Sequence, residues 1–101
     1  MHLVELLLPA KAGDGESSGG NRFDQVTVEL TNAFGGVTAF TRSPAEGLWN
    51  GKGRTERDDI VTFEVMVDTL DRAWWGVYRR NLEKRFDQAQ IIVRTHDIEL
   101  L

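Results

Sequence analysis

The stretch IVTFEVMV, from Ile60 to Val67, decides how this chain folds. Its odd-numbered positions are all apolar, and Thr62, Glu64 and Met66 alternate with them. A period of two is the spacing of a strand whose two faces meet different surroundings. We therefore predict a central strand at 60–67 with its odd-numbered side chains in the core.

A helical pattern follows this strand directly. Its apolar positions are spaced mainly by three and four residues, and they are Leu70, Trp74, Val77, Tyr78, Leu82 and Phe86. This spacing places them on one side of a helix. We predict that the helix runs to about Gln88, with Asp68 or Thr69 as its N-cap and Asp71 near its positive N-terminal end.

The adjacent tryptophans of this helix must differ in burial. Neighbouring helical positions point about 100° apart, so Trp74 and Trp75 cannot both face the core. We place Trp74 in the buried stripe. Trp75 is then partly exposed, and Arg79, one turn further on, can stack its guanidinium on the indole ring.

The N-terminal part of the chain shows the same order of elements. A strand is predicted at 3–8, followed by a flexible Gly/Ser-rich loop at 9–21. Apolar spacing predicts a helix from Asn21 to Phe34, ended by Gly35-Gly36. Alternation and β-branching at 26–30 leave a strand as the rival interpretation. Further strands are predicted at 37–42 and 90–95.

A short internal repeat connects the two halves. The pattern Leu-x-x-x-Phe occurs at Leu30 and Phe34, and again at Leu82 and Phe86, with the phenylalanines 86 − 34 = 52 positions apart. Each half then reads as strand, helix, strand. Right-handed crossovers lead from this order to an α+β, ferredoxin-like β-α-β-β-α-β sandwich. We expect a single domain over 1–101, with an antiparallel sheet of order 4-1-3-2 and both helices on one face.

A projecting hairpin is predicted at 43–57, between the second and third strands. Ser43-Pro44 interrupts the second strand, and Asn50-Gly51 favours the positive φ angles of a tight turn. Trp49 lies on this hairpin, and Arg42 immediately precedes it. A large aromatic is costly to expose, so Trp49 is expected to pack on the body or on a partner subunit. A ligand lid is the alternative role.

Composition excludes several kinds of chemistry. The chain has 101 residues, a formal net charge of −4 and no cysteine. A disulfide, a thiol nucleophile and a cysteine-ligated metal are therefore excluded. The acidic charge argues against a nucleic-acid partner, because phosphate binding depends on clustered cations. The N-terminal apolar stretch lacks a basic leader and is too short to span a bilayer, which predicts a cytoplasmic protein without a membrane partner.

Helices on one side of the sheet leave the other face open. From the strand patterns, this face should carry Leu3, Glu5, Leu7, Thr62, Glu64, Met66, Ile92, Arg94 and His96. About half of these side chains are apolar. A bare face of this kind indicates an interaction surface, and we expect a second copy of the chain to pack on it, sheet to sheet. Thr62 and Met66 are the candidate interface or ligand-binding residues on the central strand.

Four polar residues of this face form the candidate catalytic set. Glu5, Glu64, Arg94 and His96 offer two carboxylates, a guanidinium and an imidazole, which suit anion recognition or acid–base chemistry. Ion pairs at a wet sheet surface are the alternative explanation. His2 and His96 have no metal-ligand spacing, so we expect no metal, and no motif implies a cofactor.

Three segments resemble a known group of proteins. They are Phe34-Gly35-Gly36-Val37-Thr38-Ala39-Phe40, Pro44-Ala45-Glu46-Gly47-Leu48-Trp49 and Leu82-Glu83-Lys84-Arg85-Phe86-Asp87-Gln88. With them, most of residues 23–98 resembles a family of small uncharacterised bacterial proteins. The resemblance implies a ferredoxin-like α+β fold. It implies no activity and no functional residues, because that family has no established function.

Two functional hypotheses follow from the open face. The first is a homodimeric binding or structural module that uses the face as its subunit interface. The second is a small cofactorless enzyme with a pocket between the two sheets, in which Glu64 or Glu5 acts as a base and Arg94 and His96 stabilise an anion. A small-molecule ligand is a second expected partner in either case.

Overall fold

The computed structural model describes residues 1–10, 16–51 and 54–101, and at 16–21 and 41–58 it describes the backbone alone. The elements in chain order are β1 (His2–Pro9), α1 (Glu16–Phe34), β2 (Thr38–Gly51), β3 (Arg54–Val67), α2 (Arg72–Arg85) and β4 (Ile92–Asp97). The chain is therefore α+β with the β-α-β-β-α-β order predicted from the sequence. No helix in the described part of the chain is long and apolar enough to cross a membrane.

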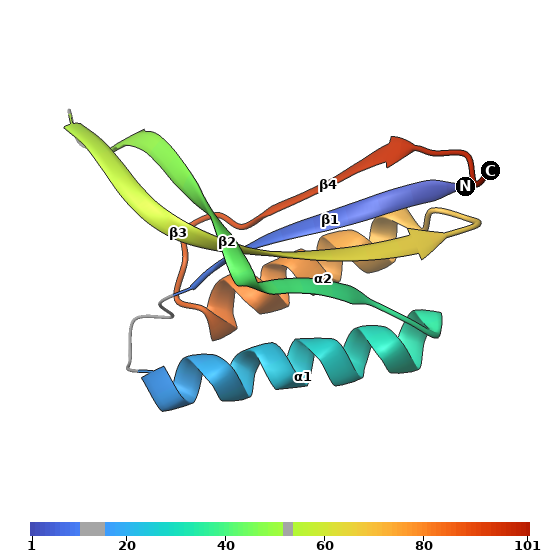
Figure 1. The fold of residues 1–101 in the computed structure, drawn as a ribbon, viewed down its shortest axis with the longest axis horizontal. Helices are drawn as coiled ribbons and strands as arrows, with labels where there is room; N and C mark the ends of the chain where they lie inside the picture. The colour runs from blue at the N-terminus through green and yellow to red at the C-terminus, as the bar shows by residue number, and fades with distance from the viewer. Residues whose placement is uncertain (11–15, 52–53) are drawn as a thin grey trace.

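The four strands form one antiparallel sheet of order β2-β3-β1-β4. Figure 1 shows both helices beneath this sheet and both chain termini at the same end of it. The predicted fold class and strand order are thus confirmed. Because both helices lie on one side, no described element covers the opposite face of the sheet.

Alternating side chains of the central strands build the core. The most deeply buried residues are Val4, Leu6, Leu8, Val26, Leu30, Phe63, Val65, Leu82 and Phe86. The repeated leucines, Leu30 and Leu82, are both fully buried, one on each helix. Phe86 is also fully buried, and Phe34 packs against the edge of the core. The repeat therefore marks equivalent packing positions of the two halves.

Residues 26–30 belong to helix α1 and do not form the strand of the rival interpretation. The helix also begins earlier than predicted. Val28, the residue that fits the apolar stripe least well, is 57% exposed on the helix surface. The helix starts at Glu16 rather than Asn21, so the loop predicted at 9–21 is shorter, and its residues 11–15 lie outside the described part of the chain. Gly35 ends the helix with φ of 85°, and its N–H donates to the Thr31 carbonyl at 2.8 Å. Glycine adopts this left-handed conformation without strain.

Helix α2 is shorter than predicted at both ends. Its N-cap is Asp71, whose carboxylate accepts from the Trp74 N–H at 3.0 Å, and not Asp68 or Thr69. The helix ends at Arg85 with Phe86 as its C-cap, and Asp87 follows with a positive φ of 52°. Local sequence leaves these alternatives open, because several aspartate and threonine side chains can serve as a cap.

The predicted burial of the two tryptophans is wrong. Trp75 is 6% exposed and Trp74 is 36% exposed. The ring of Trp75 stacks on Phe34 of α1 with centroids 5.0 Å apart and an interplanar angle of 5°. Val77, also predicted to be buried, is 51% exposed. Contact with α1 therefore rotates α2 away from the orientation that its own apolar stripe suggests.

The predicted hairpin is present as an extension of β2 and β3. The two strands pair from Thr38↔Glu64 to Phe40↔Thr62 and again from Ala45↔Ile60 to Gly51↔Arg54, with an irregularity between. β1 pairs with β3 only as far as Ile60. The far part of the hairpin is thus a two-stranded arm, seen at the upper left of Figure 1. The side chains of Arg42 and Trp49 lie outside the described residues.

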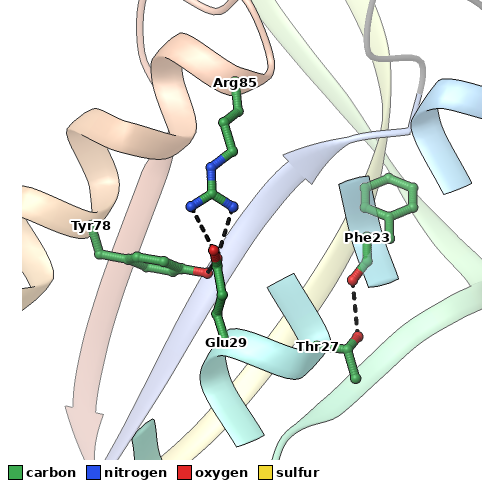
Figure 2. Close-up of polar contacts among 5 residues, drawn as sticks. All are labelled: Phe23, Thr27, Glu29, Tyr78 and Arg85. Atoms are coloured by element: carbon green, nitrogen blue, oxygen red, sulfur yellow. Dashed lines mark hydrogen bonds and ion pairs between the residues drawn. The ribbon is translucent and has the colours of Figure 1, made fainter. Parts of the chain in front are cut away.

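A polar network joins the two helices on the side away from the sheet (Figure 2). Arg85 donates two hydrogen bonds to the Glu29 carboxylate, at 2.7 and 2.8 Å, and the Tyr78 hydroxyl donates a third at 2.8 Å. Figure 2 also shows the Thr27 hydroxyl donating to the Phe23 carbonyl at 3.0 Å within α1. Burial acts to raise the pKa of Glu29, but the hydrogen bonds from Arg85 and Tyr78 and the positive charge of Arg85 outweigh it, so this pKa lies below its usual value.

Removing the Glu29 charge is expected to destabilise the fold near neutral pH. Glu29→Gln should lower the free energy of unfolding by about 1 kcal/mol at pH 7, a modest value because both charged side chains are partly exposed. Since the folded-state pKa is depressed, the stabilisation is present above the unfolded pKa near about 4.3 and disappears as the pH falls through the folded value. Urea unfolding of both proteins from neutral to acidic pH measures this difference.

The difference in stability between wild type and Glu29→Gln should therefore shrink below roughly pH 4. Asp24→Asn is a suitable control, because it removes an exposed carboxylate from the same helix, and it should leave the unfolding free energy nearly unchanged at neutral pH. A stability difference for Glu29→Gln that stayed constant into acid would contradict the assigned role of the charge.

Candidate functional site on the open sheet face

The open face is organised in three rows that cross the sheet. The strand register sets Met66, Leu3 and His96 in one row, and Glu64, Glu5 and Arg94 in the next. The third row holds Phe40, Thr62, Leu7 and Ile92. All the residues assigned to this face from strand alternation therefore lie on it. A charged row lies between two rows that are mainly apolar.

Three of the four candidate catalytic residues lie together. Arg94 Nε donates to Glu5 Oε1 at 3.1 Å, and His96 Nδ1 lies 3.9 Å from the same oxygen. The Glu5 side chain is largely covered, whereas Arg94 and His96 are more than half exposed. This geometry neutralises Glu5 with a positive side chain on the neighbouring edge strand. It is the arrangement of a surface ion pair.

Glu64 has different surroundings from Glu5. No hydrogen bond or ion pair joins its carboxylate to another described side chain, although Glu5 is its partner across the strands. Its other neighbour is Thr38, the first residue of β2. The structure thus separates the candidate set into a paired group of three residues and one carboxylate near the β2 edge.

A cavity of about 410 Å³ opens beside Glu64. It is lined by Leu3, Phe34, Gly35, Gly36, Val37, Thr38, Glu64 and Met66. β2 begins opposite Glu64, so the last residues of β3 continue without β2 beside them. The chain leaving α1 reaches the sheet at this corner. The volume falls within the roughly 300–1,000 Å³ that is usual for small-molecule sites.

Large apolar side chains remain exposed on this face. Met66 is 53% exposed, Ile92 is 48% exposed and Phe40 is 42% exposed. They come from three different strands, so the exposed apolar surface extends across the sheet. Met66 is both a cavity-lining and a surface residue, whereas Thr62 lies beside Phe40 and Leu7 outside the cavity lining.

Sequence reasoning missed the part of the site that comes from the α1–β2 connection. Gly35, Gly36 and Thr38 line the cavity, yet alternation in the strands says nothing about them. The Gly35-Gly36 pair is the signal that the sequence offers here, although by itself it predicts only the end of the helix. Nothing within 4 Å would meet a Cβ added at either glycine, so the space beside them is open.

The described residues hold no group of three or more histidine, aspartate or glutamate side chains placed to bind a metal ion. His2 is paired with a carboxylate, because its Nδ1 lies 2.8 Å from Asp97 Oδ1. This contact joins β1 to β4 at the end of the sheet where the two strands pair through these residues.

The fold has known structural relatives, although no family model and no curated protein sequence matches the chain. The periplasmic divalent cation tolerance protein CutA from Archaeoglobus fulgidus is 12% identical, with a TM-score of 0.59 over 99% of this chain and 86% of that one. The PII-like protein CutA from Nostoc sp. PCC 7120 is 15% identical, with a TM-score of 0.56 over 98% of this chain and 82% of that one.

A third protein of similar structure is an enzyme. A phage SAM lyase in complex with S-methyl-5'-thioadenosine is 14% identical, with a TM-score of 0.60 over 95% of this chain and 80% of that chain. At these identities the likeness shows the fold alone. The chain is thus a small α+β protein with a ferredoxin-like fold, and it shares that fold with CutA proteins and with a SAM lyase.

Proposed function

We propose that this protein is a homodimeric binding module whose open sheet face is the subunit interface. The observation that carries the proposal is the pair of apolar rows exposed on either side of the charged row. Exposed apolar surface that extends across several strands is unusual unless a partner covers it. The similarity to CutA and PII-like structures is consistent with a small binding module of this fold.

The row pattern favours a second copy as the partner. When a copy is turned over about a two-fold axis that runs along the strands, each apolar row can meet an apolar row. Within the charged row, Glu5 is already paired with Arg94 at 3.1 Å, which leaves Glu64 as the carboxylate of this row without an ion-pair partner among the described side chains. Self-association would therefore bury apolar surface while keeping the ion pair within each subunit.

The two-stranded arm supports the same proposal. From Glu46 to Gly51 and from Arg54 to Asp59, β2 and β3 pair with one another, and β1 pairs with neither stretch. An isolated two-stranded hairpin is marginally stable in water. Packing against a second subunit would stabilise the arm and would agree with the partner-contact role predicted for Trp49.

The wild-type protein is expected to self-associate. Sedimentation equilibrium at micromolar concentrations should give a mass of at least twice the 11.4 kDa of one chain. The mass should also persist in high salt, because the proposed contact is mainly apolar and screening weakens only its charged part. A mass of one chain at every concentration would overturn the proposed dimer.

A second candidate function is a small cofactorless acid–base enzyme. The location of Glu64 at the edge of a cavity favours it, and a SAM lyase adopts the same fold. Glu64 is the candidate base. Arg94 and His96 contact Glu5 and are not among the residues lining this cavity, so an anion-stabilising role for them at Glu64 finds less support. Catalysis by such an enzyme would require a substrate bound in this cavity beside the Glu64 carboxylate.

A further inference from the structure

The cavity beside Glu64 is electrostatically one-sided. Glu64 is the single ionisable side chain among its lining residues, and no described side chain forms an ion pair with it. Its cross-strand neighbour, Glu5, is also acidic, and the cation that Glu5 attracts lies on the opposite side of it, on β4. A ligand in the cavity would therefore meet a negative charge, and no positive side chain is among the described lining residues.

The end of α1 adds to this negative field. The helix ends at Phe34, which lines the cavity, so the last carbonyl groups lie close to it. Such a C-terminus carries a partial negative charge of about half a unit. The last turn of α1 holds no basic residue, whereas that of α2 holds Lys84 and Arg85. Within the helix itself, nothing compensates the charge at the α1 terminus.

Apolar side chains form a large part of the remaining wall, beside Thr38 and the backbone of Gly35 and Gly36. Leu3 and Met66 line the cavity from the sheet, Phe34 lines it from α1, and Val37 lines it from the connection between α1 and β2. Apolar walls favour a ligand with an apolar body, because contact removes both surfaces from water. A metal ion would find one carboxylate here and few other oxygen ligands. An anion would be repelled by Glu64.

We propose that this cavity binds a small organic cation, with its positive charge beside Glu64 and its apolar part against Leu3 and Met66. The inference rests on the proposed binding function, since it names the ligand class of that module. It does not require self-association, because all the named groups belong to one chain. In a dimer, the second sheet would cover the cavity from the open side.

Choline is a suitable probe, because it has a compact alkylated cation and a hydroxyl group. Its uncharged isostere, in which carbon replaces the nitrogen, has the same shape without the charge, and tert-butylacetic acid supplies an anion of similar size. Titrations are followed through the amide signals of Gly35, Gly36 and Thr38 in two-dimensional NMR spectra. We expect saturable shifts with choline, binding about fivefold or more weaker with the isostere, and none with the anion.

Glu64→Gln should weaken choline binding by about fivefold and leave the affinity for the isostere unchanged. Asp24→Asn is the matched control, because it changes the net charge equally at a distant position on α1, and it should bind choline as the wild type does. The spectrum of each variant also reports whether it is folded. Equal binding of choline and its isostere, or unchanged choline binding by Glu64→Gln, would overturn the inference.

Sedimentation of the same samples separates this inference from the proposed dimer. A dimer whose dissociated monomer, with the cavity uncovered, shows no charge-dependent choline binding would contradict the ligand class alone. A monomer that binds choline through Glu64 would support the ligand class and contradict self-association alone.

Discussion

Trp75→Ala is expected to destabilise the protein by about 3–5 kcal/mol, whereas Trp74→Ala should cost about 1–2 kcal/mol. Trp75 is only 6% exposed and stacks on Phe34, so its removal leaves a cavity where the two helices meet. The ring centroid of Trp74 lies 4.9 Å from that of Phe34 and 5.0 Å from that of Tyr78. Part of the Trp74 side chain nevertheless faces solvent. Chemical unfolding of the two variants measures the difference.

Trp75→Phe separates the loss of volume from the loss of the indole N–H. The Trp75 Nε1 atom is buried and has no hydrogen-bond partner among the described groups. Because removing an unpaired buried donor relieves a desolvation cost, it offsets part of the lost contact area. Trp75→Phe should therefore be far less destabilising than Trp75→Ala. Equal effects of the two alanine variants would contradict the orientation of α2 seen in the structure.

The two tryptophans show where local sequence stops being informative. Periodicity establishes that one of the pair is buried, because adjacent helical positions point in different directions. Which one is buried depends on the rotation of α2, and the stacking of Trp75 on Phe34 of α1 decides it. That contact joins residues 75 − 34 = 41 positions apart, and no pattern within α2 contains it.

The open face was more predictable. Within each strand, alternation assigns every side chain to one of the two faces of the sheet. The apolar positions of the long strand at 60–67 then show which of the two faces is the core. Glu5, Glu64 and Arg94 consequently lie on the predicted face, and the register of the strands places them in one row. Alternation does not report the offset between strands. It could not show that β2 begins opposite Glu64, and the cavity follows from that offset.

The start of α1 was missed for a related reason. Residues 16–20 include serine and glycine, which favour loops and caps over helix interiors. Their backbone is helical in the structure. Local propensity is a weak guide where the rest of a helix packs against a sheet, because tertiary contacts can extend it.

The most direct test of the open face as a subunit interface compares Ile92→Glu with Val77→Glu. Both residues are β-branched and similarly exposed, at 48% and 51%, but Ile92 lies on the open face and Val77 on the helix layer. Neither lines the Glu64 cavity. Sedimentation velocity over a concentration series should show that Ile92→Glu raises the dimer dissociation constant by about 30-fold, from roughly 2 kcal/mol of buried charge, while Val77→Glu remains dimeric. A dimer that tolerates Ile92→Glu, or that both variants dissociate equally, would contradict the assignment of the interface to the open face.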